Sequence, residues 1–374
     1  MRGPMLDGGH PPPQFSKMSS GRPARGAPGT LRGVRPAQVE DDLLPLRALE
    51  AYLDAEGIGA GTPTARRIGD GASNITYLVE RDGARVVLRR PPPPPLPPSA
   101  HDMVREARVQ IGLSRGGVRV PEILAVCEDE DVIGAPFYVM GEIEGAVITD
   151  SLPPALDTPA ERRRLGFEIV DALAELHGVD HQACGLGDLG KPTGYLERQL
   201  RRWSGLWDVN ATRELPAFGQ TGEQLRAAMP ASPPATVVHG DYRFGNVMVS
   251  TEAPARLVAI LDWEMATIGD PLADLGYLVV SWSEPGAIDH PLLLSPVTER
   301  PGFPSRDDLV ARYTERTGRD VAALRWYEAF ALWKAVVFCE AIYGRWLRGE
   351  RDDRWAGHLR DGVPRLLEVA RTLL

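Results

Sequence analysis

Several polar side chains, Asp241 and Asn246 among them, interrupt an otherwise apolar run in the stretch VVHGDYRFGNVMV from Val237 to Val249. Asp241 and Asn246 are separated by four residues, so one tight loop can present both side chains at the same point. A carboxylate can orient a hydroxyl group and accept its proton. Carboxylate and amide oxygens are also the hard ligands that Mg²⁺ prefers. The pair therefore indicates a loop that does chemistry on a hydroxyl group near a metal ion.

Asp262 is a second candidate metal ligand, because it ends the apolar run LVAILD. A carboxylate at the end of a buried strand is expected to face a cleft. The offset between Asp241 and Asn246 equals that in the protein-kinase loop H-R-D-x-x-x-x-N. Asp262 then corresponds to the Asp of D-F-G, although Trp263 and Glu264 follow it, so the mobile D-F-G switch is missing.

The stretches VVHGDYRFGNVMV and ILDWEMATIGDPLADLGYL together resemble the aminoglycoside phosphotransferase/choline kinase family, in particular the kinase-like domain fused to some acyl-CoA dehydrogenases. The resemblance runs from about residue 40 to the end. It implies an α+β, protein-kinase-like bilobal fold, with a small antiparallel-sheet N-lobe carrying one main helix and a larger, mainly helical C-lobe. It also implies ATP and Mg²⁺ as co-substrates and phosphate transfer to the hydroxyl of a small molecule. Asp241 would be the base, and Asn246 and Asp262 the metal ligands.

Other polar residues near these motifs have simpler interpretations. The ring of His239 is expected to hold the loop backbone rather than to act as an acid or base. Arg243 either positions a phosphate or forms a salt bridge. Asp270 and Asp274 are expected to cap the next helix and hold the loop, rather than to bind metal.

The turn IGDGASN, between two predicted strands, could cover phosphates with its backbone amides. It contributes Gly69, Gly71, Ser73 and Asn74 as candidate nucleotide-binding residues, with Asn74 in place of a third glycine. An ordinary glycine-rich hairpin turn is the alternative. A Rossmann motif is disfavoured, because a strand rather than a helix follows the glycines.

Protein kinases carry V-A-I-K on the third strand, and the corresponding stretch here is VVLR, which ends at Arg89. The chain has no lysine between Lys17 and Lys191, so Arg89 would have to contact the phosphates. Arginine suits this role because it stays charged and binds phosphate well. Strand alternation puts Val87 on the same face, where it could contact the adenine. The alternative is a pair of solvated basic residues at a strand end.

Two further segments complete the predicted nucleotide site. Glu106, in the helical stretch VREARVQ, would pair with Arg89, unless it is a solvated glutamate on the helix face. FYVMGEIEG would form the hinge, where Met140 makes a wall and the Gly141 carbonyl and Ile143 amide bond the adenine edge. An ordinary buried strand is the alternative for that segment.

The expected organisation is a disordered tail (1–36), an N-lobe (37–140), a hinge (141–146) and a helical C-lobe (147–374). The tail is rich in Gly, Pro, Ser and Arg and cannot bury enough apolar surface to become ordered. A helix is expected after Thr158 as N-cap, and others at about 194–209, 306–317, 321–348 and 355–373. The aromatic stripe Trp326, Phe330 and Trp333 is typical of core, although some of it could line an acceptor pocket.

Composition narrows the function classes for these 374 residues. The net charge of −9 argues against nucleic-acid or anionic-membrane partners. The three scattered cysteines suggest neither disulfides nor a zinc site, as in a reducing, cytoplasmic setting. No apolar run is long enough for a membrane helix, and the first residues lack the apolar core of a secretory signal.

Two functional hypotheses remain on these residues. One is a kinase for a hydroxylated small molecule, less cationic than an aminoglycoside and partly apolar. The other is a nucleotide-binding pseudokinase that serves as a regulatory or scaffold module, favoured by the missing lysine and glycine. The sequence leaves the acceptor, ATP versus GTP, and the oligomeric state open.

Overall fold

The computed structural model describes residues 43–69, 74–94, 101–351 and 354–374. The chain divides into two units, residues 1–38 and Val39–Leu374, and the account below concerns the second. The tail expected over residues 1–36 lies outside the described residues, as do Gly71 and Ser73.

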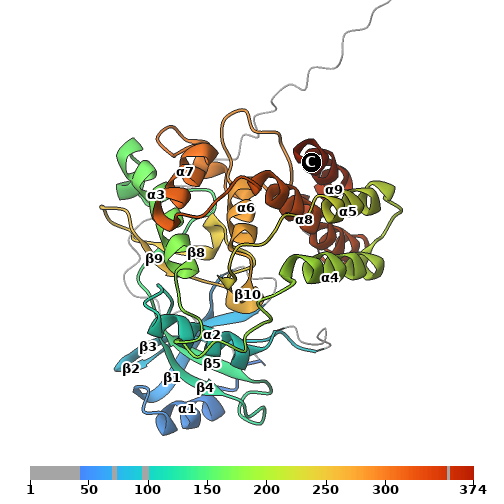
Figure 1. Cartoon of the computed structure of the whole chain (residues 1–374). Coiled ribbons are helices and arrows are strands. Elements are labelled where there is room, and N and C mark those ends of the chain that lie inside the picture. Colours follow the sequence, from blue (N-terminus) through green and yellow to red (C-terminus); the bar gives the residue numbers. More distant parts are fainter. Residues whose placement is uncertain (1–42, 70–73, 95–100, 352–353) are drawn as a thin grey trace, which may run out of the picture. The chain divides into compact units, whose positions relative to one another are not determined.

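The N-terminal part of this unit is an antiparallel sheet with one helix packed on each face (Figure 1). The strand order is β1-β2-β3-β5-β4. The strands are β1 (Ala60–Arg67), β2 (Ile75–Asp82), β3 (Ala84–Arg90), β4 (Ile123–Cys127) and β5 (Phe137–Gly141), and the helices are α1 (Leu46–Ala55) and α2 (Met103–Arg115).

Alternation along β3 gives the sheet its two apolar faces, because successive side chains point to opposite sides. Leu88 packs with Leu49 and Leu53 of α1. Val87 packs with Met103 and Ala107 of α2. The predicted hairpin turn after Asp82 is present, with Gly83 at φ 75°, a left-handed conformation that glycine adopts without steric cost.

The remaining part is mainly helical and carries two small sheets, β6-β8-β9 and β10-β7. The short strands are β6 (Ala146–Val147), β7 (Thr236–Val238), β8 (Val247–Val249), β9 (Leu257–Ile260) and β10 (Thr267–Gly269). The helices are α3 (Pro159–His177), α4 (Tyr195–Asn210), α5 (Pro216–Ala227), α6 (Pro271–Ser281), α7 (Arg306–Thr317), α8 (Leu324–Leu347) and α9 (Arg354–Leu373). Single 3-10 turns are η1 (Pro154–Leu156), η2 (Phe244–Asn246), η3 (Trp263–Met265) and η4 (Pro296–Glu299).

Local capping fixes where several of these helices begin. Thr158 caps α3 by accepting a hydrogen bond from the Glu161 amide at 3.3 Å, as predicted. Ser305 and Asp308 form a capping box at the start of α7. The predicted helices at 306–317 and 355–373 match α7 and α9 closely, whereas α5 was not predicted.

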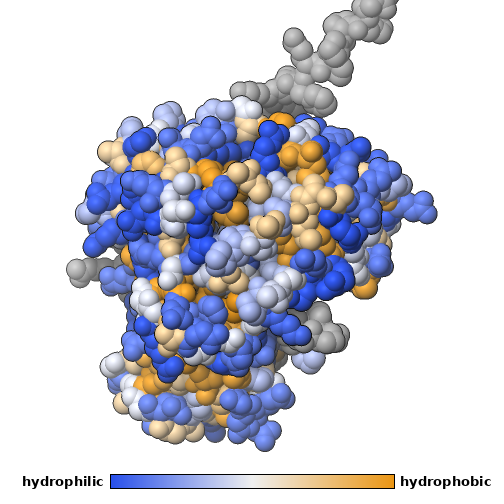
Figure 2. All heavy atoms as spheres, in the orientation of Figure 1, coloured by the Kyte–Doolittle hydropathy of each residue, from blue (hydrophilic) through white to orange (hydrophobic). Residues whose placement is uncertain are grey.

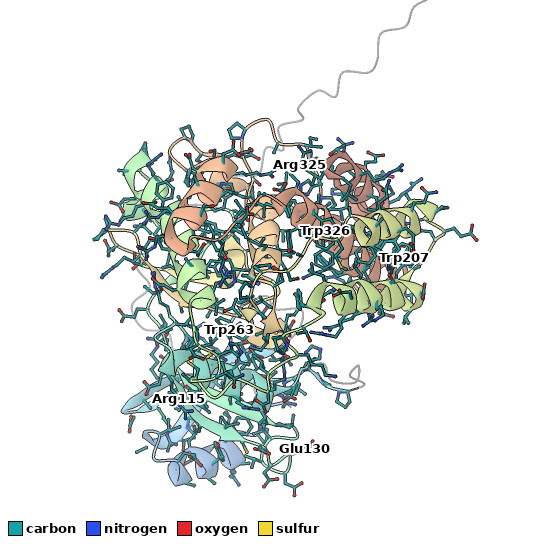
Figure 3. All side chains as sticks on the ribbon, in the orientation of Figure 1. Arg115, Glu130, Trp207, Trp263, Arg325 and Trp326 are labelled. Carbon is teal, nitrogen blue, oxygen red and sulfur yellow. The ribbon has the colours of Figure 1, made fainter. Side chains whose placement is uncertain are left out.

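The chain leaves the five-stranded sheet at Gly141, and the next strand, β6, pairs with β8 in another sheet. The predicted hinge, 141–146, lies at this change of sheet, although the lobe boundaries stay a prediction. Trp263, in η3, lies close to α2, so the first part of the unit contacts the second at this point (Figure 3). Hydrophilic residues cover much of the face in Figure 2, with smaller hydrophobic areas between them. Within the described residues, no helix is both long enough and apolar enough to cross a bilayer.

Candidate phosphotransfer site

The loop between β7 and β8 carries Asp241. The buried side chain of Asp274 holds the backbone of this loop by hydrogen bonds. The Asp274 carboxylate accepts hydrogen bonds from the amides of His239 at 2.6 Å and Gly240 at 2.8 Å. Burial raises the pKa of Asp274, but hydrogen bonds, from His177 in particular, keep it below its usual value overall. Asp274 therefore holds the loop as an ionised buried carboxylate. Asp270 caps α6 through the Leu272 amide at 3.0 Å.

The ring of His239 also holds the loop. Its Nε2 lies 2.8 Å from the Leu261 carbonyl oxygen, and its Nδ1 accepts a hydrogen bond from the Asp241 amide at 3.2 Å. The ring is fully buried, so both nitrogens are used inside the protein. These contacts agree with the structural interpretation of His239.

Asn246 connects the two predicted carboxylates. Its side-chain Nδ2 donates to Asp241 Oδ2 at 2.7 Å and to the Asp241 carbonyl oxygen at 2.9 Å. The backbone carbonyl oxygen of Asn246 accepts a hydrogen bond of 2.9 Å from the backbone amide of Leu261, the residue before Asp262. The Asp241 loop and the end of β9 are therefore fixed side by side. Because Nδ2 faces Asp241, the amide oxygen of Asn246 is the atom left to bind a cation.

Asp262 has a left-handed backbone conformation, with φ 67° and ψ 65°. Such a conformation is strained for a residue other than glycine, and strained residues concentrate at functional sites. Its Oδ1 accepts a hydrogen bond from Nη2 of Arg89 at 2.6 Å. This bond joins the sheet of the N-terminal part to a carboxylate that lies two residues after the end of β9, whereas the sequence predicted Asp262 as the last residue of the strand.

The predicted ion pair between Arg89 and Glu106 is present, with 3.3 Å between Arg89 Nε and Glu106 Oε1. Tyr138 donates from its hydroxyl to the same glutamate oxygen at 3.1 Å. Burial lowers the pKa of Arg89, but Glu106, Tyr138 and Asp262 raise it overall, so the guanidinium stays charged. The Arg89 side chain is only 15% exposed and forms ion pairs with Glu106 and Asp262, which disagrees with the alternative of a solvated strand end.

Asn74 lies in this network through its side chain. Its Nδ2 is 3.3 Å from Glu264 Oε2 and 3.5 Å from Glu106 Oε2, and its Oδ1 is 2.8 Å from Nδ1 of His101. Gly69, by contrast, is exposed at the start of the same turn with φ 73°. Asn74 therefore contributes a buried side chain to this network, whereas the sequence suggested a role for the backbone amides of the turn.

The predicted adenine wall lies on the α2 face of the sheet. Met140 is paired with Val87 across β5 and β3, and both belong to the apolar cluster with Leu78. Gly141, the last residue of β5, pairs with Val86 of β3 and donates its amide to the Glu122 carbonyl at 2.9 Å. Ile143 follows two residues later and is partly exposed.

Sequence reasoning missed Glu264, His101 and Lys334 as neighbours of this site. Glu264 follows Asp262 by two residues and was visible in the motif, but only as a departure from D-F-G. Lys334 could have been singled out because it is one of three lysines among 42 basic residues.

Comparison with known proteins places the chain in a family. The model of the phosphotransferase enzyme family matches residues 64–335. The chain belongs to this phosphotransferase enzyme family. Acyl-CoA dehydrogenase family member 11 of Rattus norvegicus is 32% identical to this family member over 312 residues. That match covers 81% of the chain but only 40% of the rat protein, so the chain spans less than half of that relative's length.

Solved structures confirm the expected α+β, protein-kinase-like fold of this phosphotransferase. A protein from Ralstonia eutropha JMP134, provisionally named an aminoglycoside phosphotransferase, is 31% identical with a TM-score of 0.73. The match covers 87% of this chain and 98% of that protein. Spectinomycin phosphotransferase, solved with ADP and spectinomycin, has the same fold at 12% identity and a TM-score of 0.57, with 88% and 98% of the two chains covered.

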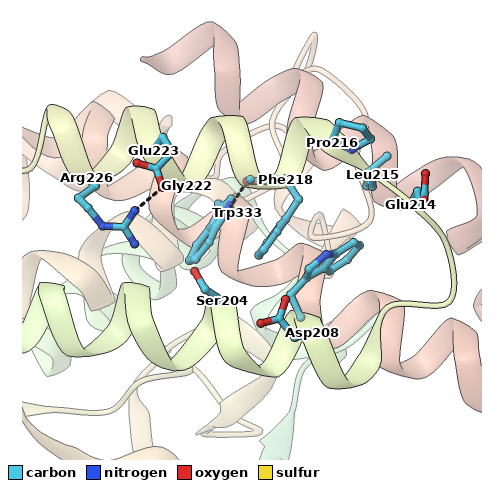
Figure 4. Close-up of a pocket in the computed structure, with 12 residues that line it drawn as sticks. Ser204, Asp208, Glu214, Leu215, Pro216, Phe218, Gly222, Glu223, Arg226 and Trp333 are labelled. Atoms are coloured by element: carbon cyan, nitrogen blue, oxygen red, sulfur yellow. Dashed lines mark hydrogen bonds and ion pairs between the residues drawn. The ribbon is translucent and has the colours of Figure 1, made fainter.

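A separate cavity of about 440 Å³ lies between α4 and α5 (Figure 4). Trp333 of the predicted aromatic stripe reaches it from α8, while Trp326 and Phe330 belong to the core. None of the predicted site residues lines this cavity. Its lining consists of Ser204, Trp207, Asp208, Glu214, Leu215, Pro216, Phe218, Gly219, Gly222, Glu223, Arg226 and Trp333.

The burial of Glu106 predicts a pH-dependent stability. Burial raises the pKa of Glu106 from 4.5 to about 7, against the opposing effect of Arg89. Because the folded state holds this proton more tightly than the unfolded chain, the associated stability is complete below pH 4.5 and is lost as the pH rises through about 7. The unfolding free energy of wild type should fall relative to Glu106→Gln by on the order of 3 kcal/mol between pH 4 and 8.

Urea denaturation of both proteins across this range measures the effect. Glu130→Gln, at an exposed glutamate, is the control for the loss of one carboxylate. A constant difference between wild type and Glu106→Gln across the range would contradict the assignment.

Proposed function

We propose that this protein transfers the γ-phosphate of ATP to a hydroxyl group of a small molecule. The proposal rests on the hydrogen bonds that hold Asp241, Asn246 and the backbone next to Asp262 together. Asn246 bonds both the Asp241 side chain and the backbone next to Asp262, and Arg89 reaches Asp262 from the sheet.

The residues fit Mg²⁺ by the chemistry of their donors. Asn246 and Asp262 offer an amide and a carboxylate oxygen, and Mg²⁺ is usually held by few protein ligands together with substrate phosphates. Within the described residues, no group of three or more His, Cys, Asp or Glu side chains could hold a metal by itself. Bound Mg²⁺ would neutralise the charge that develops on the phosphates.

The proposal assigns a role to each residue of the nucleotide site. Arg89 would contact phosphate oxygens, with Glu106 holding its guanidinium. Val87 and Met140 would contact the adenine, and Gly141 and Ile143 would bond its edge. Gly69, Gly71, Ser73 and Asn74 belong to the turn proposed to cover the phosphates, of which the described residues include Gly69 and Asn74.

Asp241 is proposed to orient the acceptor hydroxyl and to take its proton as the γ-phosphorus bonds to the acceptor oxygen, while the bond from the γ-phosphorus to the β,γ-bridging oxygen breaks and ADP leaves. Transfer is then direct and in line, and needs no covalent intermediate on the protein. A pseudokinase is less favoured, because the chain carries all three proposed metal and base residues and has Arg89 where protein kinases carry the lysine.

We propose a hydroxylated, partly apolar metabolite as the acceptor class. The relatives named as acyl-CoA dehydrogenases make hydroxylated acyl thioesters one class to include in a screen. Aminoglycosides and choline belong in it as well, since proteins of similar structure carry those names.

The test is a metabolite-library screen with Mg²⁺ and ATP, in which phosphorylated products are detected by mass spectrometry. Asp241→Asn is the control for contaminating kinases. A product that forms with wild type and not with the variant would support the proposal. ATP binding without consumption, for every acceptor offered, would favour the pseudokinase instead.

A further inference from the structure

Lys334, on α8, lies directly behind the proposed catalytic loop and is not used by the function described above. Its Nζ donates a hydrogen bond to the carbonyl oxygen of Gly240 at 2.7 Å. Gly240 is the residue before Asp241, and its amide donates to Asp274 at 2.8 Å. The Lys334 ammonium group therefore binds the carbonyl of Gly240, and the Asp274 carboxylate binds its amide.

The backbone at Gly240 has little freedom to choose another arrangement. Its φ is +86°, in the left-handed region, and an added Cβ would lie 2.9 Å from the Cβ and carbonyl oxygen of Met265. Glycine is required here both by conformation and by space. Without a side chain of its own, this residue is oriented by what its amide and carbonyl contact.

Aromatic rings from two other helices surround the ammonium group. Nζ lies 5.4 Å from the ring centre of Trp203 on α4 and 5.1 Å from that of Tyr277 on α6. The negative faces of such rings attract a cation. Burial and the nearby Asp241 raise the pKa of Tyr277 well above its usual value, so its hydroxyl stays protonated.

The choice of lysine at this position is itself informative. The chain uses arginine for all but three of its 42 basic residues. An ammonium group is compact and can donate to one carbonyl while two rings flank it, whereas the planar guanidinium of arginine requires more room. The other charged groups near Nζ are Asp241, Asp274 and Arg202.

We propose that Lys334 is a positioning residue for the phosphotransfer reaction, which fixes the Gly240 carbonyl and thereby the orientation of the Asp241 carboxylate. This inference rests on the proposed function of Asp241. Together with Asp274, Lys334 forms a pair of opposite charges that prevents rotation of the peptide groups on either side of Gly240.

The first test does not require activity. With ¹³C,¹⁵N-labelled lysine the protein has only three labelled side chains, and Lys334→Met identifies the signal of interest. Burial lowers the pKa of Lys334, while Asp241 and Asp274 raise it in part. We expect its NMR titration to lie below the usual lysine range, and Asp241→Asn to lower it further. A Lys334 signal that titrates like a solvent-exposed lysine, unmoved by Asp241→Asn, would overturn the proposal.

The second test separates positioning from nucleotide binding, with Mg²⁺–ATP hydrolysis by water as the probe reaction. Lys334→Met should lower kcat about tenfold or more, with KM for ATP changed less than twofold. Lys334→Arg should restore part of kcat, since it returns the charge. Lys191→Met, at an exposed lysine, is the matched control. Unchanged kcat, or a parallel loss of kcat and ATP affinity, would overturn the positioning role.

Thermal unfolding of each variant checks that the fold is retained. A wild-type protein that consumes no ATP with water or any acceptor would reject the proposed function. The NMR titration would still decide whether Lys334 is coupled to Asp241, so the two failures can be told apart.

Discussion

Asp241→Asn is expected to leave ATP binding nearly unchanged and to reduce turnover by at least about 10²-fold, the scale of a lost general base. Asparagine keeps the size of the side chain and can still contact Asn246 and Tyr277. It cannot accept the proton of the attacking hydroxyl at neutral pH. Calorimetric titration with Mg²⁺–ATP and steady-state turnover with an acceptor from the screen measure the two quantities separately.

The control is His239→Gln, at a neighbouring buried residue that holds the loop without contacting the reacting groups. If both variants lose activity together with their thermal stability, the loss of activity is due to disruption of the loop and not to removal of the base. Turnover of a folded Asp241→Asn protein at the wild-type rate would remove Asp241 as the base.

Asp262→Ala is expected to weaken Mg²⁺–ATP binding by at least about tenfold, since even residues behind the metal ligands typically contribute 10–100-fold to metal affinity. The variant also removes the partner of Arg89 Nη2, 2.6 Å from Asp262 Oδ1. Loss of the metal ligand should weaken binding only when Mg²⁺ is present. Calorimetry with and without EDTA therefore distinguishes it from a change in Arg89.

Asp262→Asn is the matched control, because it keeps an oxygen acceptor for Arg89 but loses the charge. We expect its affinity to lie between those of wild type and Asp262→Ala. Equal affinity of Asp262→Ala and wild type for Mg²⁺–ATP would reject the ligand role.

Much of the helical framework could be predicted from local signals. The start of α3 followed from Thr158 and the residues after it, and the expected helix at 306–317 matches α7. The helix α5 has no side-chain cap at Leu215, and Pro216 at its first position was the local start signal that the prediction overlooked.

The sequence by itself identified the candidate residues for the proposed phosphate transfer. Short stretches of sequence were enough to single out Asp241, Asn246 and Asp262. The alternation of side chains along a single strand was enough to put Val87 and Arg89 on the same face. Only the tertiary structure decided that Arg89 contacts both Glu106 and Asp262, that Asn74 enters the same network by its side chain, and that Lys334 lies behind Gly240. These contacts join residues from about 17 to 173 positions apart, and packing of the whole chain, rather than local preference, brings such residues together.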